Sequence, residues 1–225
     1  TLRITGGGVF SNTNSLVLDD AASKLHLSSI TVGSVSTSVD DSLGVVVEND
    51  STISNFAVSN TTPVSIASGK TLEGSIGVTA GSLKLTDTGS IASAVSMSGG
   101  TTLDADNSLT VSGALTHTGD ITIDVLDNKT LSYSGAPLSL GSHTLSILGA
   151  GTLSNVSGSP LVLDQTGSIL DLKGSGTVSG AVKLESGTLK SSGSATISGV
   201  LTQYSDATIE VPASQTLSYS GAPLS

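Results

Sequence analysis

The sequence predicts an all-β fold: a right-handed parallel β-helix (β-solenoid) with about 20 residues per turn and about eleven turns. Three observations predict it. The chain repeats itself at long range, its aliphatic residues alternate with polar ones in short runs, and the runs end in serine and glycine instead of tight hairpin turns. β-Solenoids combine these features because each turn packs mainly on the turns before and after it.

The long-range repeat appears at two spacings. Residues 113–139 (GALTHTGDITIDVLDNKTLSYSGAPLS) align without a gap on residues 199–225 (GVLTQYSDATIEVPASQTLSYSGAPLS), with 17 identities at a spacing of 86. Residues 1–12 match residues 144–155 at a spacing of 143. We therefore divide one continuous rod into a long copy, residues 1–143, and a shortened copy, residues 144–225, and expect it to be a window of a longer chain.

The expected strands are three to five residues long. Apolar residues at i, i+2 and i+4 place one face of each strand in a core. Along the chain these runs include Leu2–Ile4, Leu16–Leu18, Leu25–Leu27, Leu83–Leu85, Ile121–Val125, Leu170–Leu172 and Thr208–Val211. Apolar residues with helical spacing are not found over any ten residues, so we expect almost no helix.

The corners contain single glycines, as in Ser98-Gly99, Ser112-Gly113 and Ser186-Gly187. Neither Asn-Gly nor Asp-Gly, the pairs typical of two-residue hairpins, occurs in the chain. Broad corners of this kind favour the solenoid. An antiparallel sandwich, whose short strands are also separated by regularly spaced turns, is the competing fold.

Aliphatic residues that recur at about 20 residues define the expected module. The pairs are Leu103 and Ile123, Val111 and Leu131, Leu170 and Leu189, Leu189 and Ile209, and Ile197 and Leu217. We expect a core ladder in which Ile123, Leu131, Ile209 and Leu217 point inward. A narrow core of this kind also accounts for the 2% content of aromatic residues.

Composition excludes several classes of protein. The net charge of −10 disfavours binding to nucleic acid, which selects clustered Lys and Arg. The longest apolar runs, such as Val45–Val47, are far too short to span a membrane. The positive mean hydropathy and the periodic aliphatic residues argue against a disordered linker.

Several units resemble a known family. Residues 107–119 (NSLTVSGALTHTG), 174–189 (GSGTVSGAVKLESGTL) and 187–202 (GTLKSSGSATISGVLT) resemble the passenger repeats of bacterial autotransporters and of filamentous-haemagglutinin-like adhesins. The resemblance covers most of the chain and lies in the general pattern of the repeats, whose motifs are degenerate. It implies an exported β-helix that serves as a stalk or adhesive fibre, and it transfers no individual functional residue.

Catalytic residues are not evident in the sequence. Asp104 and Asp124 are one module apart and could stack on successive turns as a carboxylate pair, but in the second copy Asp104 aligns with Lys190. We interpret these carboxylates as a solvated acidic ladder. His26, His117 and His143 are each isolated in the sequence, so we expect no catalytic triad and no enzyme.

Calcium is the one metal that the sequence makes plausible, and we expect no other cofactor. The clusters Asp19-Asp20, Asp40-Asp41 and Glu48-Asn49-Asp50 supply the oxygen ligands that calcium prefers, although none follows a known calcium-binding pattern. Tyr133 and Tyr219 occupy equivalent repeat positions and share a face with leucine, so we expect them to be partly buried.

The expected function is structural. We expect a segment of a secreted or cell-surface bacterial fibre: an adhesin stalk, an extracellular filament or a biofilm-matrix protein. Its expected partners are further copies stacked end to end, or a host-cell or polysaccharide surface. The alternative is a carbohydrate-active β-helix enzyme or a tailspike-like polysaccharide-binding domain.

Overall fold

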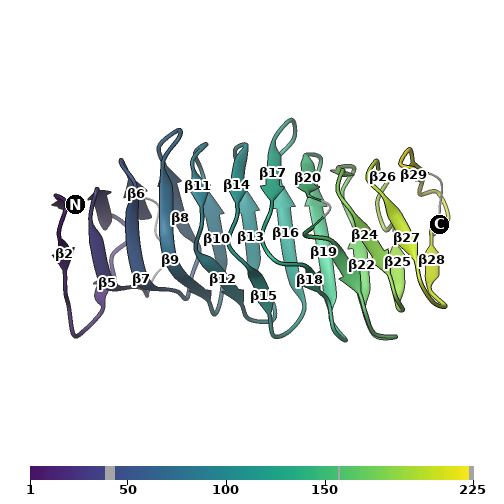
Figure 1. Ribbon diagram of the computed structural model, residues 1–225, viewed down its shortest axis with the longest axis horizontal. Helices are drawn as coiled ribbons and strands as arrows, with labels where there is room; N and C mark the ends of the chain where they lie inside the picture. Colours follow the sequence, from purple (N-terminus) through teal and green to yellow (C-terminus); the bar gives the residue numbers. More distant parts are fainter. Residues whose placement is uncertain (39–43, 157, 223–225) are drawn as a thin grey trace.

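A computed structural model describes residues 1–38, 44–156 and 158–222. In these residues the chain forms short strands that wind into a rod, with the two termini at opposite ends (Figure 1). The strands run across the long axis of the rod. The strand pairs of all three sheets are parallel, which confirms the β-solenoid and excludes the antiparallel sandwich.

The first face of the rod is an eleven-stranded sheet with one strand from each turn. Partner residues in neighbouring strands lie about one predicted module apart along the chain. In order, its strands are β1 (Leu2–Thr5), β4 (Lys24–Ser28), β6 (Gly44–Val47), β8 (Thr62–Ile66), β10 (Ser82–Leu85), β13 (Thr102–Ala105), β16 (Ile121–Val125), β19 (Thr144–Gly149), β22 (Ile169–Leu172), β25 (Thr188–Lys190) and β28 (Thr208–Glu210).

The second face follows the first after one corner of each turn. In order, its strands are β2 (Val9–Phe10), β5 (Thr31–Thr37), β7 (Ser51–Val58), β9 (Thr71–Val78), β11 (Ser90–Ile91), β14 (Leu109–Val111), β17 (Thr130–Tyr133), β20 (Thr152–Asn155), β23 (Thr177–Val178), β26 (Ala195–Ile197) and β29 (Leu217–Tyr219).

The third face is shorter and less regular. β3 (Leu16–Leu18) pairs with the end of β5, while β12 (Ala94–Met97) pairs with β9 and with β15 (Leu115–His117). A four-stranded sheet of β18 (Leu138–Ser139), β21 (Leu161–Leu163), β24 (Val182–Leu184) and β27 (Leu201–Gln203) continues this face. The long strands β5, β7 and β9 therefore contribute to two faces each.

Alternation of side chains builds the core. In β16, Ile121, Ile123 and Val125 are buried while the residues between them point outward, as period two predicts. Leu103, Ile123 and Ile147 stack in register through three turns of the first face. Like side chains on successive turns thus make one continuous aliphatic column along the rod.

A glycine allows the second face to bend into the third. The register between β7 and β9 shifts after Ile53, where Ser54 and Asn55 together oppose Ser75. At this bulge Gly74 has φ of +114°, a conformation that L side chains rarely adopt, and a Cβ atom there would lie 1.8 Å from the Ile53 carbonyl oxygen.

Two of the predicted core spacings are wrong by two residues. Leu131 pairs with Leu109, not with Val111, and Leu217 pairs with Ala195, not with Ile197. Counted between residues in register, the path from Val125 to Leu131 is two residues longer than the path from Ala105 to Leu109 one turn earlier. The second copy repeats this lengthening between Glu210 and Leu217. Asn128 and Ser214, which are equivalent in the two copies, both have positive φ in these long corners.

No helix in the described part of the chain is long and apolar enough to cross a lipid bilayer.

Candidate functional site

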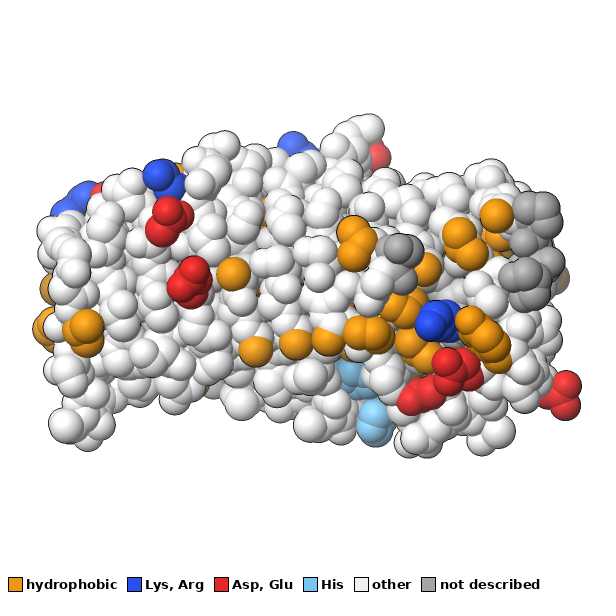
Figure 2. All heavy atoms as spheres, in the orientation of Figure 1, with side chains coloured by type: hydrophobic (Ala, Val, Ile, Leu, Met, Phe, Trp, Pro, Cys, Tyr) orange, Lys and Arg blue, Asp and Glu red, His pale blue; other side chains and the backbone are white. Residues whose placement is uncertain are grey.

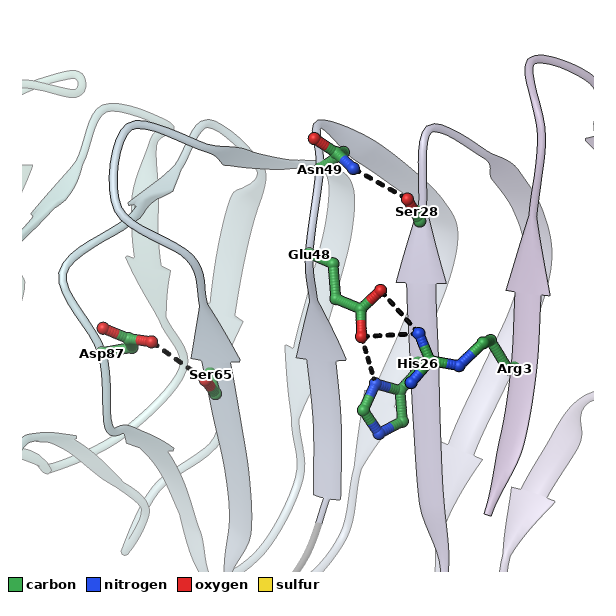
Figure 3. A network of polar contacts seen from close by, with 7 residues as sticks. All are labelled: Arg3, His26, Ser28, Glu48, Asn49, Ser65 and Asp87. Carbon is green, nitrogen blue, oxygen red and sulfur yellow. Dashed lines mark hydrogen bonds and ion pairs between the residues drawn. The ribbon is translucent and has the colours of Figure 1, made fainter.

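A polar network ties three turns together on the outside of the first face (Figure 3). Arg3 on β1 and His26 on β4 are register partners, and Glu48 directly follows β6. The Arg3 guanidinium donates to both Glu48 carboxylate oxygens at 2.8 Å, and His26 Nδ1 lies 2.8 Å from Glu48 Oε1. One carboxylate thus clamps side chains from the two preceding turns.

The electrostatics of this network fit a structural clamp. The hydrogen bond from His26 lowers the pKa of the Glu48 carboxyl. Desolvation raises this pKa, and the Arg3 guanidinium lowers it further. Side-chain hydrogen bonds between turns recur nearby, from Asn49 to Ser28 and from Ser65 to Asp87. Both oxygens of the central carboxylate are therefore already engaged within the chain.

The predicted calcium ligands are distributed over separate contacts. Glu48 belongs to the clamp, Asp20 accepts from the Ala22 N–H, and Asp50 accepts from the Thr71 N–H at 2.8 Å. Asp19 is exposed, and Asp40 and Asp41 lie outside the described residues. Within the described ranges, no three His, Asp or Glu side chains are grouped as a metal ion would need.

Asp104 and Asp124 stack on successive turns, as their spacing of one module predicts. The Lys84 ammonium, one turn earlier, lies 3.3 Å from Asp104 and 2.9 Å from Asp106. Burial raises the pKa of the Asp104 carboxyl against the opposing effect of Lys84, and the hydrogen bond to Asp106 raises the pKa of Lys84. The next carboxylates along the chain, Asp106 and Asp127, do not stack in this way. The hydrogen bond from the Leu126 N–H to the Ala105 carbonyl shows that Leu126, and not Asp127, lies beside Asp106.

Two histidines that are isolated in the sequence meet in space. The rings of His117 and His143 lie edge to face, with centroids 5.6 Å apart. Both His117 nitrogens are 3.0 Å from backbone carbonyl oxygens, those of Gly119 and Ser139, and His143 Nδ1 is 3.9 Å from Asp120. The two histidines are separated by somewhat more than one module in the sequence, which is why sequence reasoning missed the pair.

A polar groove crosses the first face further along the rod, with a volume of about 410 Å³. Thr122, Ser146, Asp171 and Lys190 form one outward row along it, a turn apart from one another. Asp171 is 7% exposed, and its Oδ1 has no hydrogen-bond partner. The Lys173 ammonium lies 4.0 Å from the other oxygen of this carboxylate.

Tyr133 is buried, and its hydroxyl spans a corner of the third face. The hydroxyl accepts from the Leu115 N–H at 3.2 Å and donates to the Ala136 carbonyl. Burial raises the pKa of this phenol. Tyr219 repeats the arrangement with Leu201 and Ala222 and is half-buried.

The four residues of the predicted core ladder differ in exposure. Ile123 and Leu131 are buried, and Leu217 is half-buried against the core. Ile209 differs from the expectation of burial, since it is 47% exposed. It is nevertheless in register with buried Leu189, and its exposure arises because β28 is paired on one side only.

Exposed apolar side chains concentrate on the two end turns. Leu2, Val9, Phe10 and Val17 are exposed at the amino-terminal turn, and Ile209 and Val211 at the carboxy-terminal turn. The long surface seen in Figure 2 consists mainly of uncharged groups, with scattered charges and apolar side chains toward its carboxy-terminal half.

Comparisons with protein-family models, with curated protein sequences and with solved structures give no match to this chain.

Proposed function

We propose that this chain is a structural rod segment of a secreted or cell-surface bacterial fibre, in which turns stack on further turns at both ends. The single observation that carries the proposal is the stacking of the turns, in which parallel strands continue each sheet from one turn to the next. Leu103, Ile123 and Ile147 form one buried aliphatic column through three turns, and each turn is held by hydrogen bonds to the turns before and after it.

A strand edge at the end of such a stack is a surface for strand pairing. An unpaired edge presents free N–H and C=O groups to another strand, and apolar side chains beside it add a favourable burial term. Repeat rods use the same stacking inside and between units, because each turn contacts only its neighbours. The next turn can belong to a longer chain or to another copy, and the hydrogen bonds and apolar contacts that hold it are the same in both cases.

The test is the concentration dependence of the 225-residue chain. At about 4.8 Å per turn, the ten intervals of the first face predict a rod roughly 50 Å long. We expect the chain to associate into species whose length grows in steps of this size, measured by small-angle scattering and electron microscopy.

Two charges at one end provide the control. Ile209→Lys with Val211→Lys places ammonium groups on the open edge and should keep the chain monomeric, whereas Leu126→Lys, at an exposed corner away from the ends, should leave association unchanged. A parent chain as monomeric as the double-lysine variant at high concentration would refute assembly through the ends.

A further inference from the structure

The polar groove on the first face lies over the longest turns of that face. Leu145 pairs with Ile121 in the turn before it and with Leu170 in the turn after it, at spacings of 24 and 25 residues. The next pair, Leu170 and Leu189, is only 19 residues apart. The groove is lined from β16, β19, β22 and β25, each of which is paired on both sides, so it belongs to the body of the rod.

Two polar side chains of this groove are almost fully buried although they belong to its outward row. Ser146 is 5% exposed, the Asp171 side chain is 10% exposed, and the two residues are register partners in β19 and β22. Among the described residues, neither side chain has a hydrogen-bond partner. A buried carboxylate without a donor is costly in the folded chain, and such a group calls for a partner that the chain itself does not supply.

We propose that this groove binds a neutral saccharide, and that the Asp171 carboxylate accepts a hydrogen bond from one of its hydroxyl groups. The inference adds a binding site to the rod and does not depend on end-to-end assembly.

The charges of the groove favour a neutral ligand over a cation. The Lys173 ammonium lies 4.0 Å from Asp171 Oδ2, and Lys190, the register partner of Asp171 in the next turn, also lines the groove. These two ammonium groups balance the carboxylates of Asp120 and Asp171, and they would repel a metal ion or an amine beside Asp171. A hydroxyl group supplies the missing donor without adding a positive charge.

The remaining groups of the groove match a sugar. When one hydroxyl of a vicinal pair donates to Asp171, the neighbouring oxygen can accept from Lys173, and both bonds are charge-assisted. The hydroxyls of Ser146 and Thr122 can each donate and accept, and Ile169 offers an apolar surface to the C–H groups of a ring. The volume of about 410 Å³ is that of a small-ligand pocket. Because the last torsion of an aspartate is soft, either carboxylate oxygen can turn toward the ligand.

The test titrates the 225-residue chain with neutral trisaccharides of glucose, galactose, mannose and N-acetylglucosamine, followed by saturation-transfer NMR and calorimetry. We expect at least one of them to bind. Asp171→Asn keeps the shape of the side chain and should weaken that binding about tenfold or more, because a charge-assisted hydrogen bond is lost. Ser146→Ala should weaken it several-fold.

Stability separates a binding role from a structural one. Because the side chains of Asp171 and Ser146 have no hydrogen-bond partner among the described residues, neither Asp171→Asn nor Ser146→Ala should lower the thermal midpoint. Asp104→Asn is the matched control on the same face, since that carboxylate is held by Lys84 at 3.3 Å and does not line the groove. It should leave the affinity for the sugar unchanged.

The saccharide site is refuted if none of the four trisaccharides binds at millimolar concentration, or if neither groove variant weakens binding. Calcium chloride that raises the thermal midpoint of the parent, but not that of Asp171→Asn, would show a cation site instead. Binding of the matching polysaccharide as well as the trisaccharide would place internal sugars of a polymer in the groove, whereas binding of the trisaccharide alone would limit the site to free sugars and chain ends. None of these results depends on whether the rod associates through its ends.

Discussion

Tyr133 and Tyr219, which are equivalent in the two sequence copies, make the same two hydrogen bonds: each hydroxyl accepts from the N–H of a leucine one turn earlier and donates to an alanine carbonyl three residues later. A phenol that bridges two backbone groups fixes the path of the corner that follows it. Because both copies retain the bridge, it is an element of the repeat and not an accident of one turn.

Tyr133→Phe should lower the free energy of unfolding by about 1–3 kcal/mol, because the Leu115 N–H and the Ala136 carbonyl lose a partner in a buried place. Urea denaturation followed by circular dichroism measures the change. Tyr204→Phe is the control, since that ring is 64% exposed and its loss should stay within about 0.5 kcal/mol. Equal effects of the two substitutions would contradict a structural role for the bridge.

Leu131→Asp should destabilise the rod by several kcal/mol, because it places a carboxylate without a partner in the aliphatic column. The same change at Leu126, which is 50% exposed at a corner, should cost little. Thermal unfolding of the two variants makes the comparison. A melting temperature for the Leu131 variant equal to that of the parent would show that the assigned register is wrong.

Gly74→Ala should cost about 1–3 kcal/mol or more, because alanine at φ of +114° is strained and its Cβ atom would collide with the Ile53 carbonyl. Gly77→Ala, three residues along the same strand, meets no atom within 4 Å and should leave stability almost unchanged. Chemical denaturation of both variants tests the difference. If Gly74→Ala left the stability unchanged, the bulge would not be a constraint on the fold.

Glu48→Gln should make the stability of the fold depend less on pH in the acidic range. The pKa of Glu48 is lowered in the folded state, so its contribution is present above the ordinary value of 4.5 and is lost as pH falls through the folded pKa. Between pH 7 and pH 3, the urea midpoint should therefore fall less for this variant than for the parent. Glu185→Gln removes an exposed carboxyl on another face and should follow the parent. If Glu48→Gln also follows the parent, the clamp does not couple to folding.

The periodic part of the structure was predictable from the sequence. Alternation in runs such as Ile121–Val125 set the inward and outward faces, and the spacing of Leu103 and Ile123 by one module placed them correctly in one column. These features depend on local geometry and on repetition, both of which a single sequence displays.

Corner lengths and contacts between turns were not predictable in the same way. Two extra residues before Leu131 changed its partner from Val111 to Leu109, because corner conformation is not encoded by alternation. The clamp at Glu48 depends on the registers of three separate turns, so its acidic cluster resembled a metal site in the sequence. The pairing of His117 with His143 was hidden for the same reason.

The orientation of the strands across the rod has a mechanical consequence. A load applied between the termini acts at right angles to the strands, so it opens the hydrogen bonds of one turn before it reaches the next. Each released turn of about 20 residues would lengthen the molecule by roughly 60 Å. Pulling in an optical trap should therefore give a saw-tooth of evenly spaced ruptures. A fibre built this way lengthens under tension in steps, and each step dissipates energy while the remaining turns stay intact.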